Sequence, residues 1–239
     1  MSFKESFTPS SLGGLFIGLG LIVSAVLITS VLGDFVDQRR FVSVKGLSER
    51  ELPADRVVWP ILYKEVGNDL LQLSRAIESK TAIITQYLED NGIESSEIAA
   101  SAPEIIDMQA ERYVAQQTPF RYNITSVITV TTNKVDKVRE LLSRQAELLK
   151  QGVAISGGDY RYNVLYQYTK LNEIKVGMIE EASANARASA EQFAADSKSK
   201  LGKIKEASQG QISITDRDPN TPHVKQIRVV TSVSYFLKD

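Results

Sequence analysis

Residues 12–32, LGGLFIGLGLIVSAVLITSVL, divide the chain into an apolar amino-terminal region and a polar remainder. They lie in a run from Ser6 to Gly33 that contains no charged residue. A helix of about 21 residues rises roughly 31 Å, which matches a bilayer hydrocarbon core of about 30 Å. The sequence therefore predicts a transmembrane anchor at residues 12–33, with a tail of residues 1–11 before it and a linker of residues 34–40 after it.

A cleaved signal peptide is the main alternative for this segment, because Lys4 precedes the run and the small residue Gly33 ends it. The run exceeds the usual apolar core of a signal peptide, about 7 to 15 residues, and its end lacks an A-x-A pattern. We therefore expect an uncleaved anchor. Charge does not orient it, because Lys4 and the free amino terminus on one side nearly balance Arg39, Arg40 and Lys45 on the other.

The composition of the chain excludes several classes of function. Its 239 residues include 28 basic and 29 acidic side chains, which gives a net charge of −1. Because these charges are interspersed and do not form a basic stripe, we expect no nucleic-acid partner. Cysteine is absent, so the chain has no disulfide, thiolate metal site or cysteine nucleophile. The residues beyond the anchor are numerous enough to bury a hydrophobic core.

The first half of the polar remainder predicts strands and one amphipathic helix. Alternating and β-branched residues indicate strands at residues 41–46, 56–66, 98–108 and 122–132. Pro60 cannot donate a backbone hydrogen bond, which places its strand at a sheet edge or at a bulge. Apolar residues at three- and four-residue spacing predict a helix that begins after an N-cap at Asn68 and ends at Asn91 and Gly92.

The second half predicts further alternation of helices and strands. A helix capped at Asn133 should end near Gly152, and a strand or hairpin should follow at residues 153–155 and 160–169. A long alanine-rich helix is expected at residues 172–201, before two strands at residues 203–214 and 224–237. The predicted fold class is therefore α+β, with two small sheet-plus-helix halves of ββαβ and βαβαββ character at about residues 41–132 and 133–239.

Several segments in this order resemble the SIMPL domain family. The first reads Val44-Lys45-Gly46-x-x-x-Arg50-Glu51-x-Pro53-Ala54-Asp55, and the second is LEDNGIE at residues 88–94. The third is ASANARASAEQFA at residues 182–194, followed by KLGKI at residues 200–204. The resemblance covers roughly residues 41–239 and is carried by the order of the motifs. Pro60 and a cluster of tyrosines at residues 160–168 are not part of the family pattern.

The resemblance implies a bacterial envelope domain of undefined biochemical role. Members of the family are associated with oxidative or envelope stress and with ring- or channel-like homo-oligomers. By this analogy the protein is a single-pass protein of the bacterial inner membrane, anchored in the lipid bilayer by residues 12–32, with its carboxyl-terminal domain in the periplasm. The resemblance carries over no catalytic residue and no cofactor.

The residues themselves offer little catalytic chemistry. His223 is the single histidine, so a histidine-based metal cluster is excluded, and a Ser-His-Asp triad would have to use it without a G-x-S-x-G elbow. We expect no metal or cofactor site. Two function classes remain: a non-enzymatic, oligomerising envelope protein, which we favour, and a membrane-anchored hydrolase that uses scattered carboxylates.

Two sets of residues are candidate contact sites. Tyr160, Tyr162, Tyr166 and Tyr168 share one face if their strand is unbroken, where they form either a contact surface or part of the core. Gly14 and Gly18 are four residues apart in the anchor, a spacing that lets two membrane helices approach closely and self-associate.

Overall fold

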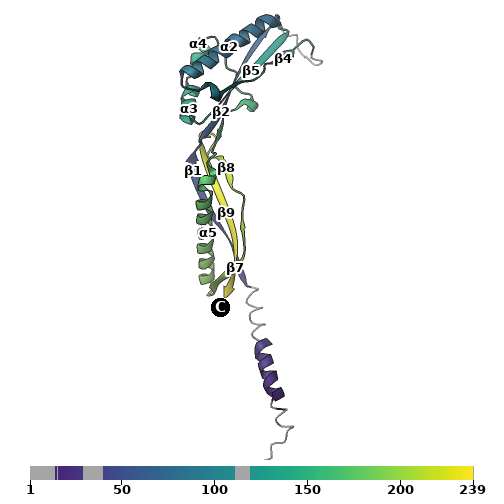
Figure 1. Cartoon of the computed structure of the whole chain (residues 1–239), viewed down its shortest axis with the longest axis vertical. Coiled ribbons are helices and arrows are strands. Elements are labelled where there is room, and N and C mark those ends of the chain that lie inside the picture. The colour runs from purple at the N-terminus through teal and green to yellow at the C-terminus, as the bar shows by residue number, and fades with distance from the viewer. Residues whose placement is uncertain (1–13, 15, 29–39, 111–118, 239) are drawn as a thin grey trace, which may run out of the picture. The chain divides into compact units, whose positions relative to one another are not determined.

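The computed structural model describes residues 14, 16–28, 40–110 and 119–238, and it has an α+β fold with two antiparallel sheets (Figure 1). Residues 14 and 16–28 are helical. The other residues of the predicted anchor, at 12, 13, 15 and 29–33, lie outside the described residues. None of the helices that the structure describes is long and apolar enough to cross a membrane.

The chain forms two compact units that interleave along the sequence. The first unit contains Met1–Glu49, Lys175–Ile212 and Arg228–Asp239, and the second contains Arg50–Ile174 and Ser213–Ile227. This division differs from the two consecutive halves that we expected to meet near residue 132. The reason is strand pairing, because the first unit joins a strand from the beginning of the domain to strands from its end.

The first unit is a sheet covered by one helix. Its strand order is β1 (Phe41–Pro53), β9 (Val224–Lys238) and β7 (Lys200–Gln209), and α5 (Leu171–Asp196) lies along this sheet (Figure 1). The buried residues of α5 are mostly alanines four positions apart, namely Ala182, Ala186, Ala190 and Ala194. A Cβ placed on Gly46 of β1 would lie 1.8 Å from the carbonyl oxygen of Ala182. Small side chains therefore bring helix and strand into backbone contact.

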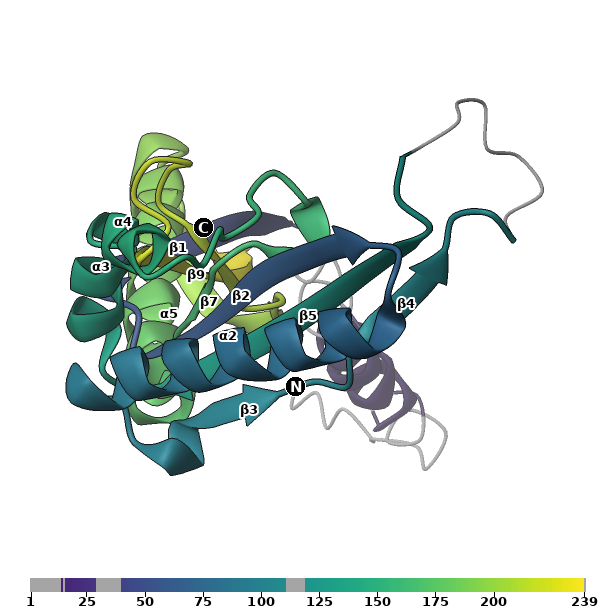
Figure 2. The ribbon, with the colours of Figure 1, turned by 90° about the horizontal axis from the view of Figure 1, so that it is seen from above.

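The second unit has a larger sheet and larger core residues. Its strand order is β3 (Ile98–Ala100), β5 (Tyr122–Thr132), β2 (Arg56–Gly67) and β6 (Leu165–Gln167), and β4 (Glu104–Asp107) also pairs with β5. Figure 2 shows α2 (Leu70–Asp90) lying along this sheet. Two shorter helices, α3 (Val135–Ser143) and α4 (Ala146–Lys150), complete the unit, and β8 (Ser213–Asp216) pairs with β9. The largest fully buried side chains of this core include Trp59, Tyr63, Ile84 and Leu88.

The strand predicted at residues 122–132 is confirmed as β5. Pro60 lies in β2 beyond the end of its pairing with β6. Strand β6 pairs with β2 only from Arg56 to Val58, whereas Pro60 pairs with Thr129 of β5. At Pro60 the far side of β2 therefore lacks a ladder partner among the described strands, so a missing N–H donor costs little.

The predicted helix after residue 68 is confirmed, but its N-cap is Asp69 and not Asn68. The Asp69 carboxylate accepts hydrogen bonds from the backbone N–H groups of Leu71 and Gln72. Asn68 instead uses its side-chain oxygen to accept a bond from the backbone N–H of Arg121. The predicted end is correct: Asn91 is the C-cap, and Gly92 has a φ of +88°, which favours glycine.

Three other predicted elements are shorter or interrupted. The strand expected at residues 98–108 consists of β3 and β4, and the helix expected from Asn133 to Gly152 consists of α3 and α4, with Lys134 as the first cap. Helix α5 ends at Asp196 because Lys198 takes a left-handed φ of +56° and Ser199 N–H bonds to the Ala194 carbonyl. As a result β7 begins at Lys200, a few residues before the position that we expected.

Candidate functional site

The second unit contains a cavity of about 720 Å³ between α2 and the strands β3, β4 and β5. This volume lies in the range of about 300–1,000 Å³ that is typical of small-molecule sites. Its lining residues come from one face of α2, from the β3–β4 segment and from β5: Leu70, Leu71, Ser74, Ile77, Glu78, Thr81, Ala100, Ser101, Pro103, Ile105, Ile124 and Ser126.

The helical side of the cavity follows from the spacing of its residues. Leu70, Ser74, Ile77 and Thr81 recur at three- and four-residue intervals, which places them on one face of α2. Ile77 is buried against the sheet, but Leu71 near the beginning of the helix is 64% exposed. The amino-terminal end of α2 therefore presents apolar side chains that the core does not cover.

The sheet side of the cavity is open because its edge strands are short. Ile124 and Ser126 of β5 are buried and form the base. Strands β3 and β4 are separated by a segment that contains Pro103, and Ile105 of β4 is 52% exposed. Since Pro103 cannot donate to a ladder, the edge is interrupted beside the cavity.

The polar side chains of the lining are Ser74, Glu78 and Thr81 on α2, Ser101 in the β3–β4 segment and Ser126 on β5. Thr81 donates a hydrogen bond to the carbonyl oxygen of Ile77, and its hydroxyl lies 2.5 Å from the phenolic oxygen of Tyr63. Ser74 donates a hydrogen bond of 3.4 Å to the Glu78 carboxylate. Among the described residues that line the cavity, Glu78 alone is charged. The site can enclose an apolar group and present one carboxylate to it.

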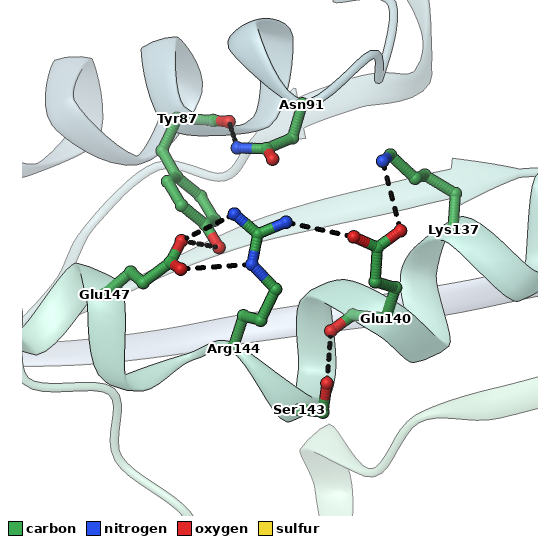
Figure 3. Close-up of polar contacts among 7 residues, drawn as sticks. All are labelled: Tyr87, Asn91, Lys137, Glu140, Ser143, Arg144 and Glu147. Carbon is green, nitrogen blue, oxygen red and sulfur yellow. Dashed lines mark hydrogen bonds and ion pairs between the residues drawn. The ribbon is translucent and has the colours of Figure 1, made fainter.

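A charged network fixes the opposite end of α2 (Figure 3). Arg144 donates to Glu140 at 3.0 Å and to both oxygens of Glu147 at 3.0 and 3.1 Å, and Tyr87 of α2 donates to Glu147 at 3.2 Å. Lys137 and Arg144 lower the pKa of Glu140, and Arg144 lowers the pKa of Glu147. Both carboxylates are therefore held in the charged form, which suits anchoring of helices and not acid catalysis.

The four predicted tyrosines do not lie on one strand face. Tyr160 and Tyr162 belong to a 3-10 turn, in which the Asp159 carboxylate accepts a bond from the Arg161 N–H, and Tyr160 is 83% exposed. Tyr166 lies in β6, is 8% exposed and packs in the hydrophobic core. The condition of an unbroken strand is not met, because the Asp159 turn interrupts the alternation, and the role of these tyrosines in a contact surface stays a prediction.

The other candidate residues lie in different surroundings. A Cβ built on Gly14 or Gly18 would meet no atom within 4 Å, so each glycine leaves an open helix surface, and their role in self-association stays a prediction. His223 lies edge-on to Tyr166, with the ring centroids 6.1 Å apart, and burial lowers the pKa of the imidazole. No cluster of three or more potential metal ligands occurs in the described part of the chain.

The cavity cannot be predicted from the spacing of apolar residues along the chain. Leu70 contributed to the predicted helix face, but sequence periodicity does not distinguish a residue that enters the core from one that borders an empty space. A signal existed in the consecutive Leu70 and Leu71, because a second leucine beside the buried face exceeds what the core requires.

Comparison with known proteins identifies the family. A search of curated proteins found no match to the chain. The family model described as "SIMPL: Protein of unknown function (DUF541)" matches residues 42–234, which include all of the second unit and most of the described part of the first. The resemblance inferred from the motifs is thereby confirmed, and the chain belongs to the SIMPL family.

Proposed function

We propose that this protein is a membrane-tethered, non-enzymatic component of the bacterial envelope that forms homo-oligomers and takes part in protection against envelope or oxidative stress. The observation that carries the proposal is the uncharged run from Ser6 to Gly33, which precedes the SIMPL domain at residues 42–234 by a few residues. An apolar run of this length favours a bilayer anchor. The SIMPL domain then extends from the membrane surface into the periplasm.

The electrostatics of the domain support a binding or structural role over hydrolysis. A general acid needs a carboxyl pKa raised toward neutrality. In contrast, charged or polar neighbours lower the pKa values of Glu97, Asp107, Asp159 and Asp218, the last two to about 2. Desolvation opposes the shift at Glu97, but hydrogen bonds from Thr132 and Lys134 outweigh it. These groups are stable anions, as expected of ion pairs.

The tether and its direction can be tested with cysteines, because the chain contains none. We would introduce Ser2→Cys and, separately, Ala207→Cys in the exposed strand β7, and label intact cells with a membrane-impermeant maleimide. The proposal expects labelling at position 207 in cells whose outer membrane is permeabilised, and labelling at position 2 only after the inner membrane is opened. Recovery of the protein in the soluble fraction, or the reverse labelling, would contradict the tether.

The assembly can be tested by native mass spectrometry of the full chain released from lipid nanodiscs. The proposal expects a homo-oligomer, and a strict monomer at working concentration would refute it. If the anchor contributes, Gly14→Leu with Gly18→Leu should reduce the oligomer fraction. Gly20→Leu is the matched control, because two residues along a helix from Gly18 lie on nearly the opposite side. Equal oligomer fractions in the two variants would exclude a contribution of the Gly14 and Gly18 face to the oligomer contact.

A further inference from the structure

We propose that the cavity between α2 and the β3–β4 edge binds the aliphatic chain of a single-chain amphiphile whose head group is cationic. This inference goes beyond the tether and the assembly, because it assigns a ligand to a site within the second unit. The volume, lining and charge of the cavity support this assignment, and none of them depends on the amino-terminal segment.

The size and lining of the cavity select an elongated apolar ligand. A dry cavity of about 150 Å³ holds one benzene, so a cavity of 720 Å³ has room for a chain and not only for one ring. Ile77 and Ile124 at its base are buried, and Leu70, Leu71 and Ile105 at its opening are exposed. An aliphatic chain laid along this path would remove apolar area from water on both sides.

The charge of the lining selects the head group. Glu78 lies on α2 one turn after Ser74, and its exposed carboxylate belongs to the cavity wall. A cationic head at the opening would gain a favourable interaction with Glu78, whereas a sulfate or carboxylate head would be repelled. Because the site is open to solvent, the preference should be modest, about fivefold or less.

An extended peptide added to the sheet edge is the competing occupant of such a groove. β-Augmentation requires a continuous row of free backbone groups. Here the edge consists of three residues in β3 and four in β4, with Pro103 between them. Short strands and proline are features that prevent edge pairing. The structure therefore favours the aliphatic ligand.

Photolabelling of the full chain in phosphatidylcholine vesicles tests the assignment. The probe is dodecylamine with a diazirine near the end of its chain, and labelled peptides are mapped by mass spectrometry. We expect labels on the segments that contain Leu71, Ile77 and Ile105, and displacement by unlabelled dodecylamine. Labels confined to residues 16–28, or displacement by an extended apolar peptide and not by dodecylamine, would overturn the proposal.

Two substitutions on one strand provide a matched pair. Ala100 pairs with Ile128 and lines the cavity, whereas Ala99 pairs with Thr129 and points to the other face of the sheet. Ala100→Trp should fill the cavity and reduce labelling by about tenfold, the equivalent of an overpacking cost within the usual range. Ala99→Trp should label like the original protein. Equal labelling of both variants would overturn the proposal.

The head-group preference is tested by Glu78→Gln, which changes an exposed side chain and keeps its shape. The amine probe should lose its advantage over the dodecyl sulfate analogue, a change of about fivefold or less. Circular dichroism confirms that each variant is folded. If Ala100→Trp does not fold, Glu78→Gln and the competition experiment still test the assignment. The assignment would be overturned if Glu78→Gln kept the preference for the amine over the sulfate probe and unlabelled dodecylamine failed to displace the probe.

Discussion

The two units cover their sheets with helices in opposite ways. In the first unit, α5 contacts the sheet through a stripe of alanines, and Gly46 of β1 has no room for a Cβ. In the second unit, α2 contacts the sheet through Leu73, Ile77, Ile84 and Leu88, which pack with Trp59 and Tyr63. One helix gains its contact by close approach of backbones and the other by large side chains.

This difference shows where each unit has spare volume. Small side chains at close approach leave nothing to fill, so α5 should tolerate no added atom on its alanine face. Large side chains fill the space between α2 and its sheet at Ile84 and Leu88, but this space stays open near Leu70 and Leu71, where the edge strands are short. The cavity is therefore a consequence of covering an incomplete sheet edge with a long helix.

We expect the largest effect from shortening a large side chain in the contact between α2 and its sheet. Leu88→Ala removes a fully buried side chain of α2, and we expect a loss of about 4 kcal/mol in the free energy of unfolding. The measurement is urea denaturation followed by the fluorescence of Trp59, the single tryptophan, which lies in the same core. Leu149→Ala changes a leucine that is 64% exposed and should cost about 0.5 kcal/mol or less. Similar losses would mean that side-chain bulk does not hold α2.

The contact between Gly46 of β1 and the alanine face of α5 should be disrupted by the addition of one methyl group to Gly46. A Cβ on residue 46 would meet the Ala182 oxygen at 1.8 Å and the Ala186 nitrogen at 2.5 Å. Gly46→Ala should therefore cost about 3 kcal/mol, the upper part of the usual overpacking range. Hydrogen exchange should show faster exchange of the amides of α5. Gly157→Ala is the control, because its Cβ would meet nothing within 4 Å. Unchanged exchange in Gly46→Ala would show that helix and strand are not in contact.

The smallest effect concerns the charged network at the end of α2. Since the native pKa values of Glu140 and Glu147 are lowered, the stability they provide is present above the unfolded carboxyl pKa of about 4.3. It is lost as the pH falls through the lowered native values. Arg144→Met should therefore flatten the acid side of the stability profile, measured as the urea midpoint of Trp59 fluorescence from pH 7 to pH 3.

The control for this prediction is Arg187→Met, which removes the ion pair of Arg187 with Glu191 on α5. Arg187 lies in the first unit, whereas Trp59 lies in the second. Arg187→Met should therefore leave the pH dependence of the urea midpoint, followed by Trp59 fluorescence, unchanged. His223 also contributes a pH dependence, since burial lowers its pKa and stability falls as the pH drops below about 6.5. This contribution is common to both variants and cancels in their difference. Identical profiles for Arg144→Met and the original protein would exclude the network as a stabilising element.

Local patterns predicted most of the elements. Strict alternation defined β5 to the residue, apolar spacing found α2, and Asn91-Gly92 marked its end. Capping was less reliable, because Asn68 and Asp69 are both good caps and only Asp69 is placed to bond the first turn. The strand predicted at residues 160–169 is interrupted for a similar reason. The Asp159 carboxylate competes for the Arg161 N–H, and sequence alternation contains no record of that bond.

The sequence by itself determined the apolar amino-terminal run, the α+β class and membership of the SIMPL family, because these depend on composition, periodicity and the order of motifs. Tertiary structure decided the interleaving of the two units, since strand pairing between β1 and β9 joins residues far apart in the chain. It also decided the cavity beside α2. Whether Leu71 and Ile105 are covered depends on where the neighbouring strands end, and that distance in space is not encoded in the spacing of residues along the chain.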